Sequence, residues 1–160
     1  MEYQEGASNQ QPPSPEEKQI EEKLKNEQQF KSGAGWFFWI AGLSLINSII
    51  MLAGKNWAFI VGLGITQIID SVALHLGEAF FYKLIAFVFD LIAAGIFIVF
   101  GVFARKGHRW SFIIGMILYA LDGLLFILVA DYLSIGFHAL VLFFLYSGLS
   151  ALKKIKLRRE

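Results

Sequence analysis

Residues 110–130 read WSFIIGMILYALDGLLFILVA. This stretch is apolar over about 20 residues, the length that an α-helix needs to cross the ~30 Å hydrocarbon core of a bilayer. It contains one acid, Asp122, at a position where a carboxylate is among the least favourable side chains. The stretch therefore predicts a membrane-spanning helix, and Asp122 is expected to face other helices of the protein and not the lipid.

The composition places the whole chain in the same class. Of its 160 residues, 56% are hydrophobic and 17% are charged, whereas soluble domains contain about 25% charged residues. The chain has no cysteine, which excludes disulfides and cysteine nucleophiles within it. The motifs typical of zinc proteases, serine hydrolases and phosphate-binding loops are absent. We predict an all-α, polytopic membrane helical bundle and lean towards a protein that is not an enzyme, with no catalytic residues, metal or cofactor.

Three further stretches are long and apolar enough to span a membrane. They are residues 35–54, 84–104 and 133–152. Segment 57–81 is ambiguous, because it starts apolar and then carries polar residues at helical spacing, which indicates an amphipathic helix. We therefore predict four transmembrane helices plus an amphipathic or re-entrant helical segment at 57–81, and five spans are the alternative.

The residues before the first span divide into two predicted segments. The first is polar and rich in Gln, Asn and Pro, and we expect it to be disordered. The second begins at Ser14, where a capping box with Glu17 and a proline at the first helical position predict a short amphipathic cytoplasmic helix. Gly33 and Gly35 are expected to end that helix. The predicted regions are a disordered tail (1–13), the short helix (14–34), the transmembrane domain (35–152) and a basic cytoplasmic tail (153–160).

The distribution of Lys and Arg predicts the orientation of the chain. In the four-span arrangement, 12 of the 14 basic residues lie on one side together with both chain ends, and only Lys55 and Lys83 lie opposite. This favours a cytoplasmic N-terminus and C-terminus, in what we expect is a bacterial cytoplasmic membrane. The residues expected to face anionic lipid headgroups are Arg105, Lys106, Arg109, Lys153, Lys154, Lys156, Arg158 and Arg159.

In this orientation, polar residues from four predicted spans fall at a common depth. At a rise of 1.5 Å per residue, Asn47, Asp90, Asp122 and His138 lie roughly 8 to 13 Å beneath the outer surface. An Asp at mid-membrane costs about 2.5 to 3.5 kcal/mol on the insertion scale, so we expect these side chains to face one another inside the bundle. The predicted polar layer consists of Ser44, Asn47, Asp90, Tyr119, Asp122 and His138.

A second polar group lies on the amphipathic segment. Residues 62–64, Gly-Leu-Gly, are interpreted as a break before its helix. His75 and Glu78 supply two metal ligands three residues apart, whereas a zinc site needs three or four protein ligands, and we predict no metal there. The polar residues of this outer segment are Gln67, Asp70, Ser71, His75 and Glu78.

The sequence leaves two hypotheses for the function. The first is a small multi-pass membrane protein without catalytic activity, an accessory or assembly protein whose polar layer fixes the register of the helices. The alternative is proton- or ion-coupled transport through an oligomer, using Asp90, Asp122 and His138. Besides the lipid, the partners considered are further copies of the chain in a homo-oligomer or a larger membrane complex. We expect no nucleic acid partner.

Overall fold

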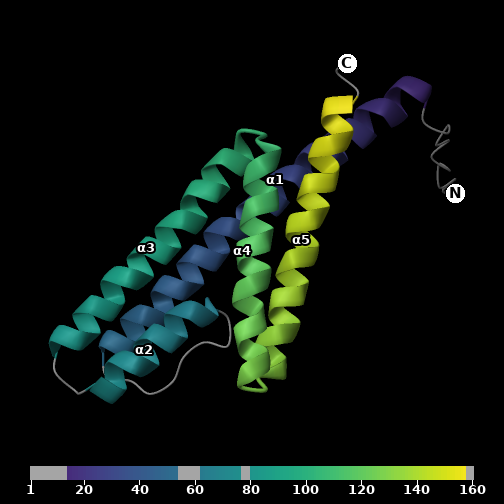
Figure 1. Cartoon of the computed structure of the whole chain (residues 1–160). Helices are drawn as coiled ribbons and strands as arrows, with labels where there is room; N and C mark the ends of the chain where they lie inside the picture. The colour runs from purple at the N-terminus through teal and green to yellow at the C-terminus, as the bar shows by residue number, and fades with distance from the viewer. Residues whose placement is uncertain (1–13, 54–61, 77–79, 158–160) are drawn as a thin grey trace, which may run out of the picture.

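The computed structural model describes residues 14–53, 62–76 and 80–157. Within these ranges the chain is α-helical without strands, and four helices are long and apolar enough to cross a membrane. The predicted fold class is thereby confirmed, and the protein is a multi-pass membrane protein. The helices, drawn in Figure 1, are α1 (Pro15–Leu52), α2 (Gly64–Leu76), α3 (Phe80–Arg105), α4 (Arg109–Leu128) and α5 (Tyr132–Leu157).

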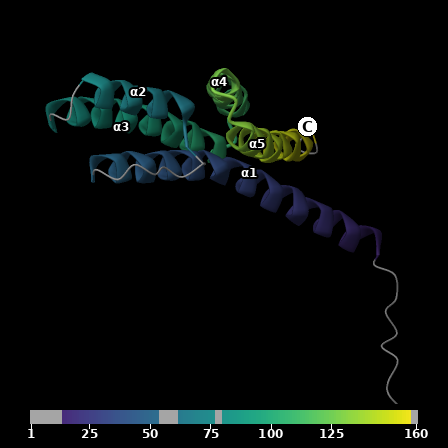
Figure 2. The same cartoon turned by 90° about the horizontal axis from the view of Figure 1, so that it is seen from below.

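The short helix α2 lies in the segment whose crossing the sequence left open. Its 13 residues extend over about 20 Å at 1.5 Å per residue, less than the ~30 Å of a hydrocarbon core. It begins just after Gly62 and Leu63, at the predicted break. Figures 1 and 2 show α2 lying alongside α3, within the bundle. The described part of this segment is thus too short to add a fifth span.

Helix α1 is a single helix of 38 residues that includes both the predicted N-terminal helix and the first span. It begins with the predicted capping box, since the Ser14 N–H donates to the Glu17 carboxylate at 2.7 Å and the Glu17 N–H donates to the Ser14 hydroxyl at 3.2 Å. The predicted helix end at Gly33 and Gly35 is wrong, because α1 continues through both residues. Gly33 instead packs against Gly148 of α5, so it allows a close helix crossing.

The crossing of Gly33 and Gly148 predicts a strict size limit at position 148. A Cβ atom on Gly148 would lie 2.7 Å from the Gly33 Cα atom, which cannot move without displacing the helix backbone. We expect Gly148→Ala to destabilise the solubilised protein by about 1 to 3 kcal/mol. Gly136→Ala on the same helix is the control, because a Cβ atom there meets no atom within 4 Å. The control should be neutral or slightly stabilising, and equal melting temperatures for the two variants would contradict the close crossing.

Aromatic rings form much of the core where α1, α3 and α4 meet. The ring of Phe37 lies 6.1 Å from that of Phe100 and 5.8 Å from that of Phe112. Phe97 packs edge-on against Tyr119 with a centroid distance of 6.0 Å. All five side chains are buried. Because edge-to-face contacts favour particular ring positions, this cluster fixes the three helices against one another.

The outward faces of α3 and α4 are apolar, while the acids within these two helices are buried. Ile92 and Leu121 are 56% and 55% exposed, whereas the nearby Asp90 and Asp122 are 0% and 7% exposed. This distribution is the one expected for helices surrounded by lipid, where an outward carboxylate finds no polar partner. Polar side chains of these helices therefore have to find their partners inside the protein.

Candidate functional site

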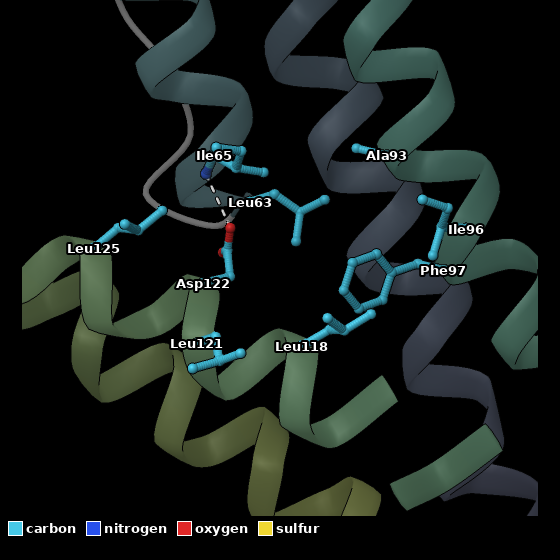
Figure 3. Close-up of a pocket in the computed structure, with 9 residues that line it drawn as sticks. All are labelled: Leu63, Ile65, Ala93, Ile96, Phe97, Leu118, Leu121, Asp122 and Leu125. Atoms are coloured by element: carbon cyan, nitrogen blue, oxygen red, sulfur yellow. Dashed lines mark hydrogen bonds between the residues drawn. The ribbon is translucent and has the colours of Figure 1, made fainter. Parts of the chain in front are cut away.

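Asp122 of α4 binds the N-terminal end of α2. Its Oδ2 atom accepts a hydrogen bond of 2.7 Å from the backbone N–H of Gly64, and its Oδ1 atom accepts one of 2.9 Å from that of Ile65. The second bond is drawn in Figure 3. The first N–H groups of a helix have no acceptor within it, and that end carries partial positive charge. The carboxylate thus satisfies two donors that are costly to leave unpaired in apolar surroundings.

Glycine at position 64 lets the end of α2 reach α4. A Cβ atom there would lie 2.9 Å from the Phe126 ring and 3.1 Å from the Asp122 carbonyl oxygen. Both distances are too short for an ordinary contact, so a larger residue would push α2 away from the carboxylate. The glycines that the sequence marks as a break therefore also permit the bonds to Asp122.

His138 of α5 contacts the same carboxyl group. Its Nε2 atom lies 3.1 Å from Asp122 Oδ2, and its Nδ1 atom lies 2.8 Å from the Ser134 carbonyl oxygen. Because a carbonyl oxygen only accepts, Nδ1 carries a proton and donates it to Ser134. The contact with Asp122 then needs one more proton, either on Nε2, which donates to the carboxylate, or on Asp122, which donates to Nε2. In both cases one proton joins the two side chains.

Aromatic rings hold His138 in this orientation. Its ring stacks on Tyr119 with a centroid distance of 4.3 Å and an angle of 15°, and the Phe126 ring lies 5.1 Å away. A Cβ atom at Gly123 would come within 3.0 Å of the imidazole, so helix α4 also packs closely against it. We name Tyr119, Asp122 and His138 the capping group, because together they hold the end of α2.

The capping group connects to the start of α5. Asp131, in the turn between α4 and α5, accepts hydrogen bonds from the Ser134 hydroxyl at 2.6 Å and the Ser134 N–H at 3.2 Å. These bonds, the one from the hydroxyl above all, hold the pKa of Asp131 below its usual value. Since Ser134 also accepts from His138, hydrogen bonds link the turn to α2 without interruption. Asp131 and Ser134 were not predicted as site residues, although an Asp directly before an apolar helix is a recognised N-cap signal.

Hydroxyl groups tie α2 to α1. The Thr66 hydroxyl donates to the Leu63 carbonyl oxygen at 2.8 Å, and the Ser44 Oγ atom lies 3.3 Å from the Thr66 Oγ1 atom. The Thr66 proton is thus engaged, and Ser44 is the donor in the second bond. The Asn47 amide lies against Gly62, on the approach to α2. Ser44 and Asn47, two predicted members of the polar layer, therefore both lie at the start of α2.

Asp90 of α3 faces α2 and forms no hydrogen bond with the capping group. It is fully buried, neither of its carboxyl oxygens makes a hydrogen bond of normal geometry within the described residues, and Ser48 of α1 is a polar neighbour. Its electrostatic neighbour is Asp70 of α2, whose Oδ1 atom is also buried without a partner in that part of the chain. Two adjacent buried carboxyl groups cannot both ionise without a large repulsive cost. We name Asp70 and Asp90 the carboxyl pair; a proton or a cation between them would remove the repulsion.

Comparison of the chain with protein-family models, curated proteins and solved structures finds no match. The functional interpretation therefore depends on the geometry of the capping group and the carboxyl pair. The members of these two groups lie on α2, α3, α4 and α5, and the capping group contacts α2 through its backbone.

The other predicted residues of the outer segment do not converge on a site. Ser71 and His75 are exposed, and His75 Nδ1 donates to the Ser71 carbonyl oxygen at 2.8 Å. Gln67 is half-buried, and Glu78 lies outside the described residues. In the ranges that the structure describes, no three His, Asp or Glu side chains are grouped as metal ligands. Among the predicted polar residues of this segment that the structure describes, Asp70 is the one that joins the carboxyl pair.

The predicted headgroup-facing residues that the structure describes lie on the α3–α4 turn, the start of α4 and the C-terminal part of α5, which are found near one end of the bundle (Figure 1). Most of their described side chains are exposed; Arg109 is half-buried, and its Nε atom has no hydrogen-bond partner among described residues. Arg158 and Arg159 lie outside the described residues. The exposed ones are Arg105, Lys106, Lys153, Lys154 and Lys156.

A cavity of about 340 Å³ lies beside Asp122, between α4 and the α2–α3 pair. Every other residue that lines it is apolar, and Figure 3 shows Leu63 and Phe97 directed into it. The carboxylate therefore meets apolar surroundings on this side, and its polar contacts lie towards α2 and α5. The bonds from the α2 backbone and the contact with His138 are thus the polar interactions that offset these apolar surroundings.

Proposed function

We propose that the protein is a non-catalytic membrane protein, an accessory or assembly subunit, whose polar side chains hold the short helix α2 in the bundle. The observation that supports this best is the pair of bonds from the α2 backbone to Asp122. Each carboxylate oxygen of Asp122 accepts a hydrogen bond from the α2 backbone, and Oδ2 also contacts His138. A carboxylate engaged in this way serves the internal structure and is not free for a substrate.

The position of α2 bears on the assembly role. Its outward residues Ile65, Ile68 and Val72 are 43%, 42% and 53% exposed, so α2 presents an apolar stripe beside the exposed Ser71 and His75. The contacts with Asp122 and Ser44 fix the direction in which this stripe points. A subunit that has to fit neighbouring membrane proteins needs such a fixed face, because ordering it at assembly would cost conformational entropy.

Native gel electrophoresis tests this proposal. Membranes from the source organism, solubilised in a mild detergent, should contain the 18.0 kDa chain in a particle larger than the purified chain in the same detergent. Asp122→Ala, expressed at the wild-type level, should shift the chain to the smaller size, while Glu16→Gln, at an exposed acid in the first turn of α1, should not. Identical mobility of the wild-type chain in membranes and after purification would contradict an assembly role.

Proton- or ion-coupled transport is the second candidate, and the carboxyl pair favours it. Asp90 is fully buried without a hydrogen-bond partner among the described residues, beside a second acid. Intramembrane acids of this kind are typical of proton relays. The proton shared by Asp122 and His138 would provide a second proton site, which lies next to the start of α2.

Proteoliposomes separate the two candidates. The vesicles contain a pH-sensitive dye, and an imposed pH gradient and membrane potential drive protons inward. A non-catalytic subunit should give the same rate of dye response as protein-free vesicles. Transport would give a faster response for the wild type that Asp90→Asn abolishes and Asp131→Asn preserves.

The orientation forms part of the same proposal. We propose that both chain ends face the cytoplasm, because Lys and Arg gather at the end of the bundle that carries the α3–α4 turn and the end of α5. Reporter fusions at the N-terminus and C-terminus should both give the cytoplasmic signal. An external signal from either fusion would overturn this orientation.

A further inference from the structure

A second cavity lies at the opposite end of the bundle from the α4–α5 turn. Its volume is about 360 Å³, and its walls come from three segments that are distant in the sequence: the middle of α1, the α3–α4 turn and the end of α5. Its apolar residues are Phe30 on α1, and Leu152 and Ile155 on α5. The cavity therefore has an apolar wall beside a polar one.

The polar wall is positively charged. Lys31, Arg105, Lys106 and Lys156 supply four positive charges, and Glu27 supplies one negative charge. The described residues provide no carboxylate within 4.0 Å of any of the four cations. All four side chains are exposed, so water and salt screen their mutual repulsion, but together they create a positive potential that attracts an anion.

The α3–α4 turn fixes two of these cations. The Gly107 N–H donates to the Ala104 carbonyl oxygen at 2.9 Å, and the His108 N–H donates to the Phe103 carbonyl oxygen at 3.1 Å. Gly107 has φ +82°, the left-handed conformation that completes this helix-ending motif and that glycine adopts without strain. Arg105 precedes it with its guanidinium 4.3 Å from the Phe38 ring centroid. The turn therefore has a defined geometry, unlike a flexible basic tail.

We infer that this cavity binds a phosphate group, carried by an anionic phospholipid headgroup or by a soluble phosphate compound. Arg and Lys side chains around one cavity match the charge and the acceptor oxygens of phosphate. Basic pockets between membrane helices bind anionic headgroups by this means. The adjacent Phe30, Leu152 and Ile155 offer an apolar surface suited to the glycerol and acyl part of a lipid.

A thermal-shift titration of the purified chain in neutral detergent tests the inference. Short-chain phosphatidylglycerol should raise the melting temperature in a saturable way, and phosphatidylcholine should not. Lys31→Gln with Lys156→Gln removes two cations, one from α1 and one from α5, and should raise the half-saturating concentration by about 30-fold. The matched control is Lys153→Gln with Lys154→Gln, which removes the same charge from exposed positions that do not line the cavity.

Inorganic phosphate distinguishes the two sources. If phosphate added without lipid raises the melting temperature, and if it also displaces phosphatidylglycerol, the site binds soluble phosphate. If phosphate has neither effect, the site binds a lipid headgroup. Both results support the inference, provided that the Lys31 and Lys156 variant weakens binding and the control does not. Equal weakening by the two double variants, or no saturable effect on the wild type, would overturn it.

Discussion

Asp122→Ala is expected to destabilise the protein by about 2 to 4 kcal/mol, because it removes the acceptor for two backbone N–H groups and the partner of His138. Each buried donor left without an acceptor costs about 1 to 3 kcal/mol, although partners available in the unfolded membrane state reduce this value. Asp122→Asn should cost about half as much, since the amide keeps one oxygen acceptor. The fold should survive the Asn substitution.

Hydrogen exchange can localise this effect. In Asp122→Ala, the amides of Gly64 and Ile65 should exchange much faster than in the wild type, because their acceptor is gone, while those of the α1–α5 crossing near Gly148 should not change. The melting temperature reports the loss of stability of the whole protein. Glu16→Gln is the control, because Glu16 is an exposed acid in the first turn of α1 and takes no part in these hydrogen bonds. Unchanged exchange at Gly64 and Ile65 would show that Asp122 does not hold α2.

Asp90→Asn is expected to have the opposite sign and to stabilise the protein by about 1 to 3 kcal/mol. The wild-type carboxyl group is buried without a hydrogen-bond partner among described residues and lies beside Asp70. An amide removes the repulsion and can donate to Asp70, so it corrects both unfavourable features with little change in volume. Asp70→Asn should act in the same direction for the same reason.

The double variant tests whether the two acids act as a pair. If the repulsion between Asp70 and Asp90 is the cause, the two substitutions together should stabilise the protein by less than the sum of the single effects. Chemical or thermal unfolding of the three variants and the wild type provides the full cycle. A destabilising Asp90→Asn would mean that the ionised carboxylate has a binding partner, such as a cation, in the folded protein.

Much of the fold was predictable because it follows from local physical chemistry. Length and apolar content identify the spanning helices, the Ser14 and Glu17 capping box marks the start of α1, and the glycines at 62 and 64 mark the break before α2. Each of these signals is contained within about one helix length of sequence. They need no knowledge of which helices are neighbours.

The continuity of α1 was not predictable in the same way. Gly33 and Gly35 have the local character of a helix end, and the prediction followed that character. In the structure the role of Gly33 depends on Gly148, a residue on the last helix. A glycine that permits a close crossing and a glycine that ends a helix are alike in a single sequence, and the partner helix decides between them.

The partners of the two buried acids were also beyond sequence reasoning. Counting residues along a helix estimates the depth of Asp90 and Asp122, but it does not say in which direction each side chain points. Asp122 is directed to backbone N–H groups of α2, which no residue type can reveal, and Asp90 is directed to Asp70. The sequence analysis grouped Asp70 with the outer segment, because the packing of α2 against α3 depends on tertiary structure.

The length of α1 has a mechanical consequence. From Pro15 to Lys25 each residue of this helix is exposed, and those 11 residues extend over about 16 Å. The same rigid rod continues without a hinge to Gly33, where it touches α5 backbone to backbone. A protein that binds the exposed Ile20 and Leu24 could displace these turns sideways. Because α1 is continuous, the displacement would act on its contact with α5 at Gly33. We expect such a displacement to change the spacing of α1 and α5 at their glycine crossing.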